Sequence, residues 1–140
     1  HMHSRDRVDI WNSFGAAVRE RPVLGSGFHA SARMADDPVA LRVPPERRTL
    51  LGAGHPHNAF LQIWVEGGAA GAALFGVLLA SLAGPLMRLR GGAAVAVGGF
   101  AAGAALIAAV SHGAWQGWWI AVVGLSIALL AVGRGEHAHG

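Results

Sequence analysis

Two long runs without a charged side chain constrain this sequence more than any other feature. Residues 67–87 contain no Asp, Glu, Lys or Arg, and neither do residues 91–133. A helix of about 20 apolar residues crosses the hydrocarbon core of a bilayer, so the first run suffices for one span and the second for two spans and a turn. The sequence therefore predicts an all-α membrane protein with spans at about 67–87, 92–110 and 115–133.

The first 58 residues differ in composition from the rest. They carry 8 Arg and 6 acidic residues, although charged residues make up only 14% of the whole chain. Lysine and cysteine are absent. Every cation is therefore an arginine, which can bind phosphate through two parallel hydrogen bonds, and no disulfide or thiolate metal site can form. We expect residues 1–58 to form an extramembrane segment and residues 59–140 to contain the membrane helices.

The N-terminal segment contains one clear helical pattern. Residues 6–20 place apolar side chains at helical spacing, which predicts an amphipathic helix that ends before Pro22. The stretch RPVLGSGF then combines a proline with two glycines and predicts a tight turn; anion binding by its backbone amides is the weaker alternative. Residues 35–56 contain four prolines and show no clear period. They indicate an irregular loop.

Polar side chains precede the first span. A helix is expected to begin near residues 55–58, because Pro56 suits the first helical position, and to continue into the membrane. Asn58, Gln62 and Glu66 follow at intervals of four and therefore share one helix face. A carboxylate at the membrane edge is costly unless it is paired, so an arginine or histidine partner is expected for Glu66.

The short connections predict the orientation in the membrane. Arg88 and Arg90 follow the first span and Arg134 follows the third, which places both of these ends in the cytoplasm. Residues 1–58 and the turn at 111–114 are then expected together on the opposite face. Aromatic side chains typical of a membrane interface follow that turn: Trp115, Trp118 and Trp119.

Three motifs, in this order, resemble those of the O-antigen ligase family of membrane glycosyltransferases, which also includes O-antigen polymerases and protein O-oligosaccharyltransferases. They are Arg7 four residues before Trp11, the Pro–x–x–Gly–x–Gly turn in RPVLGSGF, and a His–Asn helix start followed by EGGAAG. The resemblance covers about residues 4–80. It implies that this chain is the last portion of a larger helical bundle, with the catalytic groups in a periplasmic loop at the bacterial inner membrane.

The resemblance also implies a reaction. A glycan would move from undecaprenyl diphosphate to a hydroxyl group of lipid A–core, among membrane lipids, with no metal, other cofactor or nucleic acid. His57 is the candidate catalytic base, expected in the first helical turn, where the helix dipole disfavours a charged imidazole. Arg7 is the candidate ligand of the diphosphate. Further residues expected to bind substrate are Asn58, Gln62, Arg47 and Arg48, and those expected to support the site are Trp11, Glu66 and His55.

The two principal site residues also have alternative, purely structural interpretations. His57 can be a residue that only hydrogen-bonds the loop and helps to cap the helix, and Arg7 can be a solvated charge. At the level of function, the alternatives are an O-antigen or exopolysaccharide polymerase of the same family and, from another class, a non-catalytic subunit for polysaccharide transport or assembly. The chain is expected to be part of a longer enzyme and to be inactive alone.

Overall fold

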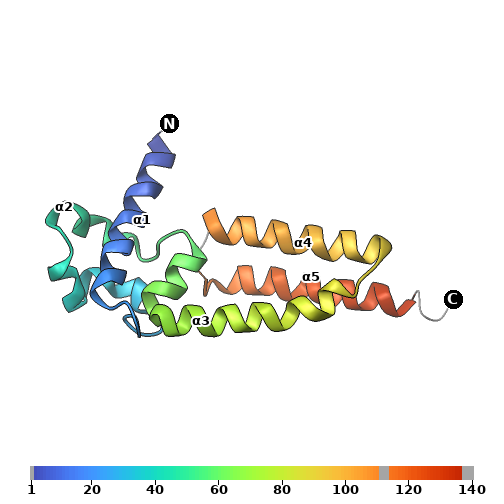
Figure 1. Cartoon of the computed structure of the whole chain (residues 1–140). Helices are drawn as coiled ribbons and strands as arrows, with labels where there is room; N and C mark the ends of the chain where they lie inside the picture. The colour runs from blue at the N-terminus through green and yellow to red at the C-terminus, as the bar shows by residue number, and fades with distance from the viewer. Residues whose placement is uncertain (1, 111–113, 137–140) are drawn as a thin grey trace.

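The computed structural model describes residues 2–110 and 114–136. Every regular element in these ranges is helical, which confirms the predicted all-α class (Figure 1). The N-terminal part, residues 2–58, contains α1 (Met2–Glu20), η1 (Ala30–Asp36), η2 (Pro38–Arg42), α2 (Pro45–Arg48) and η3 (Thr49–Ala53). The long helices that follow are α3 (Ala59–Met87), α4 (Gly91–Val110) and α5 (Gly117–Glu136).

The N-terminal part has an apolar core to which the first turns of α3 contribute. Helix α1 contains the helix predicted over residues 6–20 and ends at Glu20, before Pro22. Its C-terminal half supplies buried residues to this core, whereas residues 6–9 are exposed. The largest fully buried apolar side chains in the core are Phe14, Met34, Val39, Val43, Leu51 and Val65.

The expectation of an irregular loop over residues 35–56 is wrong. This stretch forms short helical segments that pack against α1 and one another. Pro38 and Pro45 occupy first-turn positions of η2 and α2. A proline fits there because the first N–H groups of a helix have no intrahelical partner. Helices of one turn between closely spaced prolines are too short to show a helical spacing of apolar residues, so the sequence did not predict them.

Two of the long helices have stretches that are long and apolar enough to cross a membrane: Ala59–Ser81 in α3 and Gly91–Val110 in α4. In α5 the apolar stretch within the described residues is shorter, Gly117–Ala128. The third predicted span therefore stays a prediction. Helix α5 begins at Gly117 rather than near residue 115, because Ala114–Gln116 belong to the preceding turn.

The long helices run in alternating directions away from and back toward the N-terminal part (Figure 1). Residues 88–90 connect α3 to α4 at the far end. The turn before α5 lies at the near end, since the backbone N–H of Ala114 and the indole of Trp115 both hydrogen-bond to side chains of α3. The N-terminal part and Ala114–Gln116 thus lie at the same end of the long helices. Residues 111–113 of the predicted turn lie outside the described residues, and the orientation in the membrane stays a prediction.

Helix α3 is interrupted at Gly68, whose backbone is not helical (φ 59°, ψ −160°). The first turns of α3 therefore cross the direction of the rest of the helix (Figure 1). A break of this kind frees backbone groups that need new partners. Residues 22–27 supply them through four backbone hydrogen bonds: Ser26 N–H to Val65 O (2.9 Å), Gly27 N–H to Glu66 O (2.8 Å), Ala69 N–H to Pro22 O (2.8 Å) and Ala70 N–H to Val23 O (3.0 Å).

Candidate functional site

The site is built around the start of α3. Asn58 caps the helix, since its Oδ1 accepts a hydrogen bond from the backbone N–H of Leu61 (2.9 Å). The helix therefore begins at Ala59, and the expectation that Pro56 is the first helical residue is wrong. Pro56 is instead fully buried. The asparagine side chain satisfies a backbone N–H group of the first turn, which the side chain of a proline cannot do.

His57 lies just outside the helix, in the left-handed backbone region (φ 51°). The expectation that it occupies the first helical turn is therefore wrong. Non-glycine residues adopt positive φ uncommonly, at a cost of roughly 1–2 kcal/mol, and such strained positions cluster at functional sites. The bend turns the chain sharply between His55 and the helix, and the side chain of His57 is half-buried there.

The side chains of His55 and His57 are in contact. Their ring centroids are 4.2 Å apart, at an interplanar angle of 57°. The backbone N–H of His57 donates to Nδ1 of His55 (3.3 Å). The other ring nitrogen of His55, Nε2, lies 3.4 Å from the side-chain amide of Gln116, in the turn before α5. His55 thus connects His57 to the end of the molecule where α5 begins.

Glu66 is the central buried charge of the site, with only 4% of its surface exposed. Among residues 2–110 and 114–136, no arginine or histidine side chain pairs with it, contrary to the expectation. Its carboxylate accepts four hydrogen bonds from neutral donors. The donors are the backbone N–H groups of His29 (2.9 Å) and Ser31 (3.4 Å), Nε2 of Gln62 (2.8 Å) and Nε1 of Trp115 (2.6 Å). Several such donors can satisfy a buried carboxylate without a counter-charge.

Gln62 extends this network to a third segment. It lies one turn before Glu66 on the same face of α3, as the spacing predicts, and is buried. Its Oε1 accepts a hydrogen bond from the backbone N–H of Ala114 (2.8 Å). Gln62 and Glu66 together therefore fix the N-terminal part and the start of α5 to one helix face.

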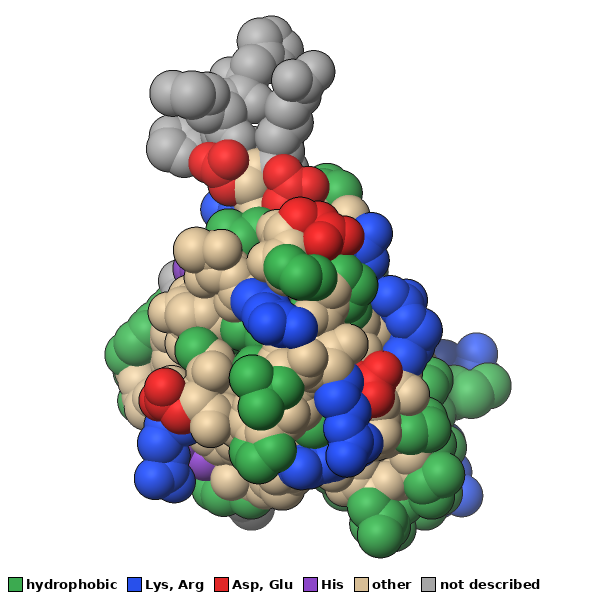
Figure 2. Space-filling model, turned by 90° about the vertical axis from the view of Figure 1, so that its left-hand side faces the viewer, with side chains coloured by type: hydrophobic (Ala, Val, Ile, Leu, Met, Phe, Trp, Pro, Cys, Tyr) green, Lys and Arg blue, Asp and Glu red, His purple; other side chains and the backbone are tan. Residues whose placement is uncertain are grey.

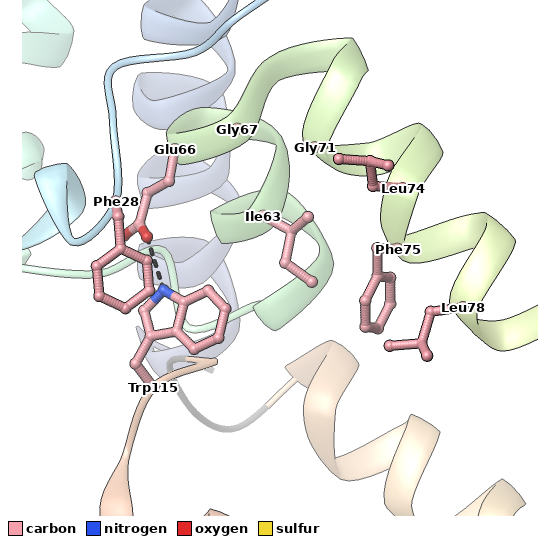
Figure 3. Close-up of a pocket in the computed structure, with 9 residues that line it drawn as sticks. All are labelled: Phe28, Ile63, Glu66, Gly67, Gly71, Leu74, Phe75, Leu78 and Trp115. Atoms are coloured by element: carbon pink, nitrogen blue, oxygen red, sulfur yellow. Dashed lines mark hydrogen bonds between the residues drawn. The ribbon is translucent and has the colours of Figure 1, made fainter.

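A pocket of about 340 Å³ lies beside the kink in α3. Phe28 and Trp115 stand at one end, with ring centroids 4.9 Å apart. The carboxylate of Glu66 lies beside them and bonds the indole of Trp115 (Figure 3). The rest of the lining is apolar or glycine and continues along α3: Ile63, Gly67, Gly71, Leu74, Phe75 and Leu78.

The arginines proposed to bind substrate lie in different surroundings. Arg7 is exposed on the N-terminal half of α1 and takes no part in the network around Glu66. Arg48 is half-buried, and its guanidinium donates to the backbone carbonyls of Val43 (2.8 Å) and Leu41 (2.6 Å). Arg47 beside it is also half-buried. Figure 2 views this end of the molecule and shows basic and acidic side chains scattered between apolar ones.

Two other sequence features find structural roles. Trp11 is half-buried, and its Nε1 is shielded from solvent without a hydrogen-bond partner among the described residues. The amides of Ser26 and Gly27 donate to carbonyls of α3, so this turn holds the kink and its N–H groups do not face an open anion site.

Within residues 2–110 and 114–136, no group of three or more His, Asp or Glu side chains could hold a metal ion.

Sequence reasoning missed the contributions of Phe28, Trp115 and Gln116. The sequence pattern indicates only a membrane-interface role for Trp115, although its indole bonds Glu66. The available signal was the position of Glu66 at the membrane edge, which required donors from somewhere in the chain. Nothing in the local sequence indicated that they would come from 37 and 49 residues away.

Comparison with known proteins adds independent information. The sequence model of the O-antigen ligase family matches residues 2–76, which include the N-terminal part and the kink in α3. A protein of Rickettsia prowazekii (strain Madrid E) named as a candidate polysaccharide ligase is 30% identical over 122 residues, covering 81% of this chain and 28% of the relative. A protein of the same description from Rickettsia bellii (strain RML369-C) is 30% identical over 129 residues, covering 86% of this chain and 30% of the relative. The chain thus spans less than a third of these relatives. No solved structure matches it significantly.

Proposed function

Because the chain belongs to the O-antigen ligase family, we propose that it carries the catalytic groups of a membrane glycosyltransferase that acts on the periplasmic face of the bacterial inner membrane. One observation carries the proposal. The family match covers the same residues that gather at the start of α3, where a strained histidine, a helix-capping asparagine and a buried glutamine–glutamate pair meet the first apolar span.

The proposed reaction transfers a glycan from undecaprenyl diphosphate to a hydroxyl group. The acceptor oxygen forms a bond to the anomeric carbon, and the bond from that carbon to the diphosphate oxygen breaks. The acceptor hydroxyl loses its proton, and the diphosphate leaves with the bonding electrons. A chain that performs this step needs a base for the proton and cations for the departing diphosphate. A site at the membrane edge suits a donor whose lipid lies in the bilayer.

We assign the base to His57. Its strained backbone is held between the buried Pro56 on one side and the capped start of α3 on the other. His55 is assigned a positioning role, since its Nδ1 accepts the backbone N–H of His57 and its ring packs against that of His57. A fixed backbone and a packed neighbour restrict the directions in which the His57 imidazole can point.

Arg7 is proposed to bind the diphosphate. A guanidinium presents two parallel N–H groups to phosphate oxygens, and the exposed position of Arg7 leaves it accessible to a lipid-linked substrate. Arg47 is a second, weaker candidate. Arg48 already donates to two carbonyls of its own loop, so we propose that it holds the loop and contacts substrate only through remaining donors. Asn58 and Gln62 are proposed to shape the site through the cap and the network described above.

The acceptor is proposed to be lipid A–core, which makes the enzyme a ligase. The names of the two rickettsial relatives favour ligation over the alternative, extension of the glycan by a polymerase of the same family. A non-catalytic role in polysaccharide transport or assembly is the alternative from another class.

The test uses the full-length protein that carries this chain, reconstituted with a polyprenyl-diphosphate-linked glycan. Lipid A–core is supplied in one reaction and omitted in another. A ligase forms glycan-bearing lipid A–core only in the first reaction. A polymerase lengthens the lipid-linked glycan in both. Release of no diphosphate in either reaction, with intact folded protein, would assign the chain to the non-catalytic class.

A further inference from the structure

The segment Pro22–Phe28, called here the interfacial loop, exposes an unusual amount of apolar surface. Val23, Leu24 and Phe28 are 62%, 77% and 76% exposed. Among residues 6–58, only two other large apolar side chains are exposed, Val8 and Leu41. Single exposed apolar residues are ordinary on a protein surface, but three within seven residues form a patch that indicates a binding surface.

The charge pattern around the interfacial loop is also unusual for an extramembrane segment. Residues 22–32 contain no Asp, Glu, Lys or Arg, and an arginine flanks the run on each side, Arg21 and Arg33. Arg21 pairs with Asp37 at 3.3 Å, whereas Arg33 is exposed. An apolar segment bordered by a cation is typical of polypeptide that lies in the interface of a bilayer, where arginine can reach lipid phosphates.

The height of the interfacial loop along α3 is fixed. The four backbone hydrogen bonds described above join the loop to residues 65–70 on both sides of the kink. Gly25 and Gly68 pack there without room for a Cβ atom on either. The loop therefore cannot slide along the helix, and its exposed side chains stay level with the kink.

This level coincides with the start of the charge-free run of α3, although the apolar stretch of the helix extends back across the kink to Ala59. The charge-free run begins at residue 67 and ends at residue 87. At 1.5 Å per residue it measures about 30 Å, the thickness of the hydrocarbon core. Because the first turns of α3 cross the direction of the rest of the helix, we count the span from the kink, which puts the residues at the kink at the membrane boundary. The ring of Phe28 packs there at a tilt of 53° against that of Trp115, an aromatic pair at the level where interfacial aromatic side chains gather (Figure 3).

We propose that the interfacial loop inserts into the lipid–water interface, with Val23, Leu24 and Phe28 in contact with lipid. Continuity of the apolar surface identifies the bilayer as the partner: exposed apolar side chains of α3, among them Leu74 and Leu78, continue the patch along the span. The loop holds the N-terminal part against the membrane and so keeps the start of α3 at the interface. This inference goes beyond the glycosyltransferase reaction and does not depend on it.

The test places a single cysteine at position 24 of the full-length protein and labels it with an environment-sensitive fluorophore. The native sequence of this chain has no cysteine, and a Leu24→Cys side chain at an exposed position disturbs no packing. Leu41→Cys is the matched control, because Leu41 is similarly exposed (73%) but belongs to η2, which packs on α1, η1 and α2 rather than on α3. Each protein is reconstituted in vesicles of ordinary phosphatidylcholine or of phosphatidylcholine brominated near the top of the acyl chains.

The label at position 24 is expected to lose most of its fluorescence in the brominated vesicles and to resist quenching by aqueous iodide. The label at position 41 should show the opposite behaviour. Quenching of both labels by iodide alone would overturn the proposal, since the loop would then face water. Protection of position 24 from both quenchers would also overturn it, because another protein segment and not lipid would cover the loop.

Discussion

Gly25 and Gly68 meet backbone to backbone. A Cβ atom on Gly25 would lie 2.6 Å from the backbone nitrogen of Gly68, and a Cβ atom on Gly68 would lie 2.5 Å from the backbone nitrogen of Gly25. Both residues also have positive φ angles, 67° and 59°. The turn in RPVLGSGF and the kink in EGGAAG therefore form one structural unit, in which each segment needs a glycine because of the other.

This pairing predicts that Gly25→Ala and Gly68→Ala strongly destabilise the protein. A positive φ alone costs an alanine on the order of 1–3 kcal/mol, and Gly68, with ψ −160°, lies in a region that is almost exclusive to glycine. The overlap with backbone atoms adds to this cost. The measurement is thermal unfolding in detergent. Gly67→Ala is the matched control, since a Cβ atom there meets nothing within 4 Å and Gly67 has no positive φ. Equal melting temperatures for all three variants would show that Gly25 and Gly68 are not required for the packing of the turn on the kink.

Glu66 is predicted to stabilise the junction between the N-terminal part and the start of α5. Glu66→Gln replaces one acceptor oxygen by an NH₂ group, so some of the four donors lose their partner. Each buried donor left unsatisfied costs about 1–3 kcal/mol. We expect a clear drop in melting temperature, and no such drop for Glu46→Gln, an exposed residue of α2. A Glu66→Gln protein as stable as the original would mean that the hydrogen bonds contribute little.

The orientation prediction is tested with two further cysteine substitutions. Asp36→Cys lies in the N-terminal part and is exposed, whereas Leu89→Cys lies in the connection between α3 and α4. We expect a membrane-impermeant maleimide to label position 36 from the periplasmic side and position 89 only after the membrane is opened, because arginine-rich connections stay cytoplasmic. Labelling of both positions from the same side would contradict the orientation.

Arg7→Lys in the full-length protein is predicted to lose most glycan transfer. A lysine keeps the charge but cannot copy a two-pronged grip on a diphosphate. Because Arg7 is exposed on α1, the fold should be unaffected. Arg19→Lys, an equally conservative change at an exposed position of the same helix, should leave transfer unchanged. If the two variants transfer glycan equally well, Arg7 is a solvated surface charge.

The sequence was sufficient for the helical class and for features that depend on local periodicity. Charge-free runs predicted the long helices, and intervals of four placed Gln62 and Glu66 on one face. The helix start was mispredicted because Pro56 and Asn58 both suit a helix N-terminus, and only the packing of Pro56 in the interior decides between them. Local signals of similar strength leave such boundaries undecided.

The network around Glu66 was beyond local reasoning. Its donors come from segments 35, 37 and 49 residues away as well as from Gln62, and only the folded chain brings them together. The kink has the same origin. Gly67 and Gly68 are adjacent and alike in sequence, yet only Gly68 leaves the helical conformation, because the turn at Gly25 packs against it.

The catalytic role of His57 is tested by measuring glycan transfer by the full-length protein with His57→Asn. Asparagine tolerates the positive φ of this position but has no basic nitrogen, so the substitution separates a catalytic role from a conformational one. If His57 is the base, the rate falls by about 10²–10⁴-fold while protein level and melting temperature stay unchanged. His55→Asn, the control, should reduce the rate much less. Transfer at the original rate by the His57→Asn protein, or a larger loss for His55→Asn, would contradict the assignment of His57 as the base.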